Sequence, residues 1–354
     1  MVNKNAQEPW MSDMTAEQRM TDGQPATTMG RVSGLSREQL LSAYRQMKII
    51  REFEERAHVE NAAGAIPGFT HLYCGQEAVA VGACEHLSDA DYIISTHRGH
   101  GHCIAKGCDV VGMMKEIHGR RDGLNGGKGG SMHIADIGKG MLGANGIVGA
   151  GQPIAVGAAI ACKLRGEGRV AASFTGDGAS NQGTVFEAMN MAVVLQVPKV
   201  FVFENNGYSE HTGASYGIGC DDIVKRIEGF GIPVWEADGF DFFSVYEAMG
   251  KALEVSRDGG GPTAIYCTTI RYFGHFEGDP QNYRAKGEVQ RYREEHDCLV
   301  NFRQRVLANG ELDEACLDAI DREVRALIER AVDEARSAPR PRIEDLLTNI
   351  YDNY

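Results

Sequence analysis

A Gly-Asp-Gly turn after one apolar run, and an Asn-Asn pair after the next, constrain the fold of this chain most strongly. The turn Gly176–Gly178 closely follows Val170–Phe174, and the pair Asn205–Asn206 closely follows Val200–Phe203. A helical pattern over Thr184–Gln196 separates the two runs, so the segment predicts a right-handed βαβ unit. The carboxyl ends of its strands should meet at one edge of the sheet, where open α/β folds bind ligands.

The rest of the chain repeats this alternation of short apolar runs and helical patterns. Further expected strands are Tyr92–Ser95, Val234–Glu236 and Ala264–Thr269, and further expected helices are Val110–His118, Pro153–Arg165, Ile223–Phe230 and Phe243–Arg257. Such alternation is typical of a parallel sheet that helices cover on both faces. We therefore predict an α/β fold with a doubly wound, mostly parallel sheet.

Helical segments flank this α/β region. Ser36, with Gln39 three residues on, predicts the capped start of a first helix, and a second helix is expected from about Gln76 to Glu85. The charged segment from Lys286 onward also has helical periodicity. We predict a flexible tail over 1–34, an α/β domain with N-terminal helices over 35–285, and a helical extension over 286–354.

Composition excludes several classes of protein. The formal net charge of −13 argues against nucleic-acid binding, which needs a basic surface. No apolar stretch is long enough to predict a membrane span. The nine cysteines include no Cys-x-x-Cys pair, which favours free thiols in a reduced, cytoplasmic protein.

The two motifs supply the kinds of group that bind a metal ion together with a phosphate. Asp177 offers a carboxylate, Asn206 an amide oxygen and Tyr208 a backbone carbonyl, which are the hard ligands that Mg2+ prefers. The backbone N–H groups of Gly178 and Ala179 can face a phosphate. A lone Gly-Asp-Gly is usually a plain turn, but the Asn-Asn pair after the next strand makes the combination specific. No Gly-x-Gly-x-x-Gly after a strand supports a nicotinamide site.

At this point the chain resembles a known family. The segment from Gly176-Asp177-Gly178 to Asn205-Asn206 matches the thiamine diphosphate signature, and five further motifs occur in the family's order: His71–Glu77, Arg98–Gly101, Gly126–His133, Asn145–Gly149 and Arg271–His275. Together they resemble the alpha subunit of the thiamine-dependent first component of 2-oxo acid dehydrogenase complexes. The resemblance spans roughly Ser36 to Tyr292, and it implies thiamine diphosphate and Mg2+ as cofactors.

The resemblance also implies a role for each matching residue. Asp177, Asn206 and the Tyr208 carbonyl are expected to bind Mg2+, and Gly178, Ala179 and Arg98 to approach the diphosphate. Gly146 and Val148 should face the aminopyrimidine ring. His275 and His71 are the catalytic candidates, and His97 and His275 should also contact the cofactor. His100 and His133 are further candidates for lining the pocket.

Within the family, two features resemble acetoin dehydrogenase alpha subunits. These are Ser95–His102 and Gly274–Asp279, in which His97 and Phe276 stand where pyruvate-specific relatives commonly have Tyr and Ser. This branch implies cleavage of acetoin to acetaldehyde and a hydroxyethyl unit that passes to a lipoyl group. A pyruvate or branched-chain 2-oxo acid dehydrogenase alpha subunit is the alternative, and a non-catalytic assembly subunit is an alternative of another class.

The resemblance implies partners as well. Members of this family take the carboxylate that activates the cofactor from a beta chain, and this sequence has no second α/β domain of comparable size. We therefore expect an α2β2 heterotetramer with cofactor sites between the chains, working with a lipoyl acyltransferase component.

Overall fold

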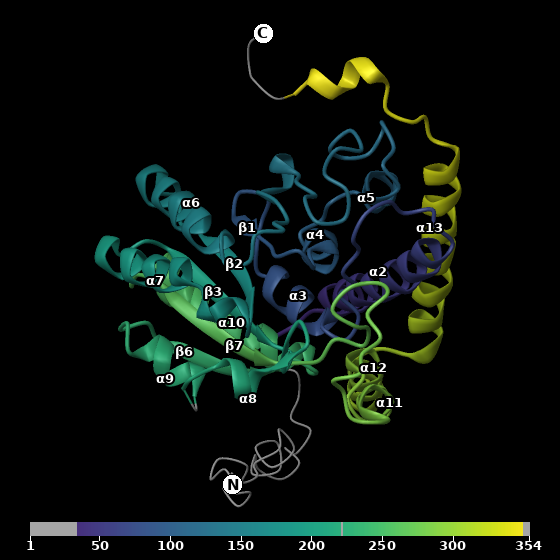
Figure 1. The fold of residues 1–354 in the computed structure, drawn as a ribbon. Coiled ribbons are helices and arrows are strands. Elements are labelled where there is room, and N and C mark those ends of the chain that lie inside the picture. The colour runs from purple at the N-terminus through teal and green to yellow at the C-terminus, as the bar shows by residue number, and fades with distance from the viewer. Residues whose placement is uncertain (1–33, 221, 350–354) are drawn as a thin grey trace, which may run out of the picture. The chain divides into compact units, whose positions relative to one another are not determined.

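The computed structural model describes residues 34–220 and 222–349, and a parallel sheet lies at the centre of this part (Figure 1). Its strands are β1 (Tyr92–Ile94), β2 (Ala171–Gly176), β3 (Lys199–Asn205), β6 (Val234–Asp238) and β7 (Thr263–Thr268). They are ordered β1-β2-β3-β7-β6, and every pair is parallel. Each lies within a few residues of an expected strand, so the predicted α/β fold is confirmed.

Helices cover both faces of this sheet. On one face, α6 (Gly151–Arg165), α7 (Gly183–Leu195) and α9 (Ile223–Glu228) pack on the strands. Alternate residues of β3, Phe201 and Phe203, enter this apolar cluster because successive side chains of a strand point to opposite faces. The other face carries α10 (Phe242–Arg257), which contacts β6 and β7 and packs on α3 (Glu77–Cys84). The sheet is therefore doubly wound.

The N-terminal helix α2 (Arg37–Ala62) begins as the sequence predicts. Ser36 Oγ accepts a hydrogen bond from the Gln39 backbone N–H at 3.2 Å, and Gln39 Oε1 accepts one from the Ser36 N–H at 2.9 Å. This capping box satisfies two N–H groups that the first helical turn leaves free.

The C-terminal helix α13 (Glu314–Ser337) packs against α2 and α5 (Val110–Ile117), as the upright yellow helix in Figure 1 shows. Its buried residues include Leu317, Ile320, Val324, Ile328 and Val332, which share one helical face. The division at residue 285 stays a prediction; the described residues from Gly34 onward cluster as one compact unit. The tail expected over 1–34 lies almost entirely outside the described residues.

Short elements complete the described part of the chain. They are α4 (His100–Ala105), the hairpin β4 (Tyr208–Ser209) with β5 (Thr212–Gly213), α8 (Ala214–Gly217), α11 (Glu288–Glu295), α12 (Cys298–Ala308) and the 3-10 turns Ile137–Lys139, Ala179–Asn181 and Ile343–Leu347. All nine cysteines are free thiols. Among the described helices, none combines the length and apolar character that crossing a membrane requires.

Candidate active site

A cavity of about 180 Å³ opens at the carboxyl ends of β2 and β3. Strand register explains why it brings the two motifs together, because Gly176 of β2 is paired with Glu204 of β3. Nine of the site residues expected from sequence line the cavity: His97, Arg98, Val148, Asp177, Gly178, Ala179, Asn206, Tyr208 and His275. Loops before α4, before α6 and after β7 thus contribute alongside the two strands.

Asp177 is the most unusual acid of the cavity. It is buried, and its Oδ2 atom has no hydrogen-bond partner in the protein. Burial raises the pKa of Asp177 to about 6, although its backbone hydrogen bonds and the Arg271 charge act in the opposite direction. A buried carboxylate oxygen without a partner is costly. It is also the atom that a hard cation would bind, so the residue fits a metal ligand.

Asn206 lies on the neighbouring strand end. Its Nδ2 donates to Gln76 Oε1 at 3.2 Å, and its Oδ1 accepts a long hydrogen bond of 3.3 Å from the Tyr208 N–H. These contacts fix the amide within the cavity wall. Asp177 and Asn206 therefore meet at one edge, as the order of the motifs predicts.

Gly178 leaves room for another part of the chain. A Cβ atom at this position would lie 2.2 Å from Ser209 Oγ and 2.5 Å from Ser209 Cβ, both far inside van der Waals contact. The hairpin β4–β5 thus packs directly on the Gly-Asp-Gly turn. The close approach explains why this position takes glycine.

Two buried guanidinium groups face the same cavity. Arg98 donates to the carbonyl oxygens of Leu72 and His275, at 2.5 and 2.8 Å. Arg271 donates to the Glu210 carbonyl oxygen at 2.6 Å and to the Tyr283 hydroxyl at 2.9 Å. Burial, with the neighbouring Arg271 charge, lowers the pKa of Arg98 to about 9.

Neither guanidinium forms an ion pair with a carboxylate in the described part of the chain. Two buried cations with only neutral partners favour an anionic ligand, and the planar fork of arginine suits phosphate oxygens. The sequence motifs contain Arg271, but no role was expected for it. The general rule that basic side chains gather at phosphate sites could have identified Arg271 as a candidate ligand of a phosphate.

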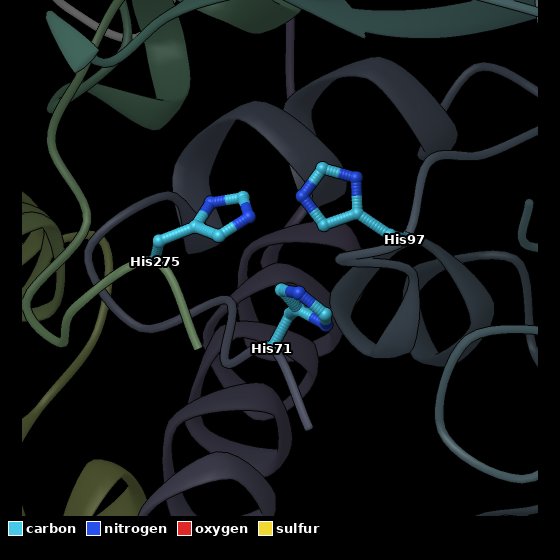
Figure 2. A group of neighbouring side chains, drawn as sticks. All are labelled: His71, His97 and His275. Carbon is cyan, nitrogen blue, oxygen red and sulfur yellow. The ribbon is translucent and has the colours of Figure 1, made fainter. Parts of the chain in front are cut away.

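Three histidines converge beside these cations (Figure 2). The ring centroids of His71 and His97 are 4.6 Å apart, those of His71 and His275 are 5.0 Å apart, and those of His97 and His275 are 5.3 Å apart. Burial, with the Arg98 charge, lowers the pKa of His71 to about 3 and that of His275 to about 4. All three rings are neutral near pH 7, because burial also lowers the pKa of His97 well below 6.5.

The loop that carries His275 is held by one buried acid. Asp279 accepts hydrogen bonds from the His275 N–H, the Gln281 N–H and the Tyr283 hydroxyl, at 2.6, 2.8 and 2.6 Å. Burial alone would raise the pKa of Asp279, but these donors lower it to about 2. The carboxylate therefore stabilises the loop in its ionised form.

Some expected residues lie beside the cavity instead of in its lining. His71 reaches it through its ring contacts with His97 and His275, and Gly146 packs near the His133 ring. His100 is enclosed elsewhere, because Nδ1 bonds Glu54 Oε2 and Nε2 bonds Ser131 Oγ, each at 3.0 Å. Neither His100 nor His133 belongs to the cavity lining, so the expectation that they line the pocket was wrong.

The sequence expectations missed a polar network in the cavity wall. Glu204, which lines the cavity, accepts a short hydrogen bond from the Tyr73 hydroxyl and lies 3.2 Å from His102 Nε2. The other nitrogen of His102 bonds Ser95 Oγ at 2.7 Å, and Ser95 lines the cavity too. Ser95 and Glu204 both lie at strand ends, where the rule for ligand binding in α/β sheets could have indicated them.

The sheet edge, the Asp177 oxygen without a partner and the two buried guanidinium groups define an α/β protein whose polar cavity suits an anionic ligand. The chain belongs to the dehydrogenase E1 component family, whose model matches residues 45–344. It is 56% identical to the alpha subunit of the acetoin:2,6-dichlorophenolindophenol oxidoreductase of Cupriavidus necator, over 90% of this chain and 96% of that one. The corresponding Bacillus subtilis subunit is 50% identical over the same shares of both chains.

The alpha subunit of the Rhizobium meliloti pyruvate dehydrogenase E1 component is 42% identical, over 91% of this chain and 92% of that one. Membership of the family implies thiamine diphosphate as cofactor, a beta subunit as partner and a lipoyl-bearing component as the further partner. The resemblance drawn from the sequence motifs is thereby confirmed.

Proposed function

We propose that this chain is the alpha subunit of a thiamine diphosphate-dependent dehydrogenase that cleaves acetoin. The observation that carries the proposal is the buried Asp177 carboxylate, whose Oδ2 atom has no partner, beside two guanidinium groups with only neutral partners. A diphosphate with Mg2+ satisfies both kinds of group at once. The acetoin branch is supported by the names of the two relatives above, which are 56% and 50% identical to this chain over the 320 residues aligned.

The cavity residues divide between metal and diphosphate. Asp177, Asn206 and the Tyr208 carbonyl would hold Mg2+, while Arg98 and Arg271 would neutralise the diphosphate. The N–H groups of Gly178 and Ala179, which line the cavity, would donate to it. Gly146 and Val148 would support the aminopyrimidine ring, a role carried by the resemblance.

Thiamine diphosphate supplies, when bound, the nucleophilic carbon and the electron sink for carbon–carbon cleavage. The protein then has to orient the substrate and handle protons. Arg271 Nη1 lies 3.3 Å from His275 Nδ1, and arginine can only donate, so the neutral ring of His275 carries its proton on Nε2. That N–H can donate to a substrate oxygen in the cavity, and His71 and His97 lie beside it.

The products and partners follow from the same proposal. Cleavage of acetoin releases acetaldehyde, and the remaining two-carbon unit passes to a lipoyl group of a lipoyl acyltransferase. The beta chain supplies the carboxylate that activates the cofactor, in an α2β2 heterotetramer. We also place the protein in the cytoplasm, which the nine free thiols support.

A substrate panel tests the proposed activity. Both chains are purified together with thiamine diphosphate and Mg2+, and reduction of 2,6-dichlorophenolindophenol is followed with acetoin, pyruvate or 2-oxoisovalerate. We expect the largest kcat/KM for acetoin. A larger value for either 2-oxo acid would overturn the acetoin assignment in favour of that dehydrogenase, and no turnover with cofactor bound would favour the non-catalytic alternative.

A further inference from the structure

The three histidines beside the cofactor cavity form a compact group of nitrogen ligands. Each ring offers one nitrogen, and these three atoms all lie within 4.8 Å of one another. Figure 2 shows the rings turned toward a common point from three separate segments of the chain. Within the described residues this is the one cluster of three or more His, Cys, Asp or Glu side chains with such geometry.

The lone pairs of this cluster are largely free. His71 is 7% exposed, and its buried Nδ1 has no hydrogen-bond partner. His97 forms ring contacts but no hydrogen bond with any described residue. Only His275 has a partner, the long contact of 3.3 Å with Arg271. Neutral imidazole is the form that binds metals, and the lowered pKa values of these rings keep them neutral.

We propose that His71, His97 and His275 form a site for one transition-metal dication of the Zn2+ class. Imidazole suits Zn2+, Co2+ and Cu2+, whereas Mg2+ prefers oxygen, so this site differs in chemistry from the oxygen ligands around Asp177. Nitrogen atoms around a tetrahedral Zn2+ stand about 3.4 Å apart, given bonds of about 2.0–2.1 Å, so ligand atoms now up to 4.8 Å apart must approach one another by up to about 1.4 Å on binding. The fourth position faces the cavity, which His97 and His275 line.

Positive charge near the cluster opposes a dication. Arg98 and Arg271 both act on these histidines. His275 binds a metal through Nδ1 only by giving up its Arg271 contact, or through Nε2 only after the proton moves to Nδ1, which breaks the same contact. A diphosphate held by the two arginines would offset that charge. The site should therefore be occupied best when the cofactor is bound, and the holoenzyme is the form to examine.

Occupation of the site blocks the cavity. The metal removes the Nε2–H donor or changes the orientation of His275 that the proposed reaction needs, so Zn2+ should inhibit reversibly. This consequence rests on the proposed function. Binding of the metal does not, and the two can be measured separately.

Cobalt provides the direct test. The αβ complex is prepared without a histidine tag, saturated with thiamine diphosphate and excess Mg2+, and titrated with Co2+ while visible absorption is recorded. A tetrahedral site with nitrogen ligands gives intense bands, whereas Co2+ replacing Mg2+ at oxygen ligands gives weak ones. We expect one intense-band equivalent per alpha chain, which Zn2+ displaces. Absence of these bands would overturn the proposal.

Substitutions of the histidines test whether the Co2+ absorption bands come from this cluster. His71→Gln and His97→Gln should each weaken Co2+ binding at least about tenfold, because loss of even an outer-shell partner of a metal ligand weakens binding by about 10–100-fold. The control His296→Gln alters a half-exposed histidine outside the cavity and should leave the titration unchanged. Wild-type affinity in both cluster variants would contradict the assignment, and having two variants keeps the test decisive if one complex does not assemble.

Inhibition is measured last, on the same preparations. Zn2+ at the concentration that fills the site should stop acetoin-dependent dye reduction, and a chelator should restore it. If acetoin is not a substrate, the cobalt bands still decide the metal site. If the bands appear and turnover continues unchanged in saturating Zn2+, the inhibitory role is wrong.

Discussion

At the scale of single residues, the buried Asp177 carboxyl lowers the stability of the cofactor-free protein, although the same group is proposed to bind Mg2+. In the folded chain its carboxyl holds a proton up to a pKa of about 6, above the ordinary 3.8, so unfolding releases protons over this range. Stability without a ligand therefore falls as the pH rises from about 4 through 6, and the loss persists at pH 7. We expect Asp177→Asn to raise the free energy of unfolding of the cofactor-free protein by about 1–3 kcal/mol at pH 7.

The same variant should lose Mg2+-dependent binding of thiamine diphosphate. Calorimetry on the purified complex measures binding, and denaturant unfolding at pH 7 and pH 4 measures stability. The stabilisation should shrink at pH 4, where the wild-type carboxyl is already protonated. Retained cofactor affinity would overturn the metal assignment, as would the same loss in a Glu329→Gln control, an exposed acid on α13.

Gly178 gives a second prediction at this scale. Gly178→Ala places a methyl group into Ser209, so the hairpin β4–β5 must move, at a cost of about 1–3 kcal/mol. Gly183→Ala is the matched control from the same motif, because a Cβ there meets nothing within 4 Å and alanine favours the start of α7. Thermal unfolding and cofactor titration should show both losses in Gly178→Ala alone. Equal behaviour of the two variants would contradict the packing explanation.

Single residues also show what the sequence could and could not predict. Asp177, Asn206 and the strands before them follow from motif order, because adjacent parallel strands bring their ends together. The Glu204–His102 contact could not be predicted, since it joins residues 102 positions apart in the sequence and depends on how α4 packs in the folded chain. The expectation that His100 lines the pocket was wrong for the same reason. Only the folded structure shows that both ring nitrogens of His100 are hydrogen-bonded, to Glu54 and Ser131.

At the scale of elements, the loop after β7 depends on Asp279. Its donors favour the ionised carboxylate, whose folded pKa of about 2 lies below the ordinary 3.8. This stabilisation is therefore present above about pH 4 and is lost as the pH falls through about 2. Asp279→Asn removes charged acceptors from three hydrogen bonds, and each such bond contributes about 1.5–3 kcal/mol.

We expect Asp279→Asn to loosen the loop locally while the sheet stays folded. Hydrogen exchange at neutral pH should accelerate over residues 274–283, and kcat with acetoin should fall because His275 is no longer held in place. The exchange of β2 and β3 is the internal control. Uniform acceleration over the whole chain would show a global loss of stability instead, and no change in the loop would contradict the role given to Asp279.

Most helices and strands are determined by neighbouring residues and could be predicted, whereas α4 depends on contacts with distant parts of the chain. The five strands and the helices α2, α3, α5, α6, α7, α9, α10 and α13 were predicted, because apolar periodicity and caps such as Ser36 are written in neighbouring residues. The helix α4 was not expected, since its residues His100–Ala105 include glycine and two histidines with little helical pattern. Five of its six residues are buried, and packing against α2 and α3 stabilises a helix that the local sequence does not predict.

At the scale of the whole molecule, the chain exposes apolar side chains that a partner can cover. On neighbouring helices α6 and α7, Ile154, Leu164, Met191 and Val194 are 47%, 82%, 49% and 71% exposed. Ile147 and Val148 at the cavity are 70% and 44% exposed. A patch of this kind is typical of an interface. We expect the beta chain of the proposed α2β2 assembly to cover this patch.

We therefore expect Val194→Glu to prevent assembly, because it would place a charge within an apolar contact. Light scattering coupled to gel filtration should give the α2β2 mass for the wild type and smaller species for the variant, with unchanged circular dichroism. Val59→Glu, at a 52% exposed position on α2, is the control and should assemble normally. Because the beta chain is proposed to supply the activating carboxylate, dye reduction should disappear with assembly. If Val194→Glu still gave an active α2β2 complex, the helices α6 and α7 would not form the essential interface.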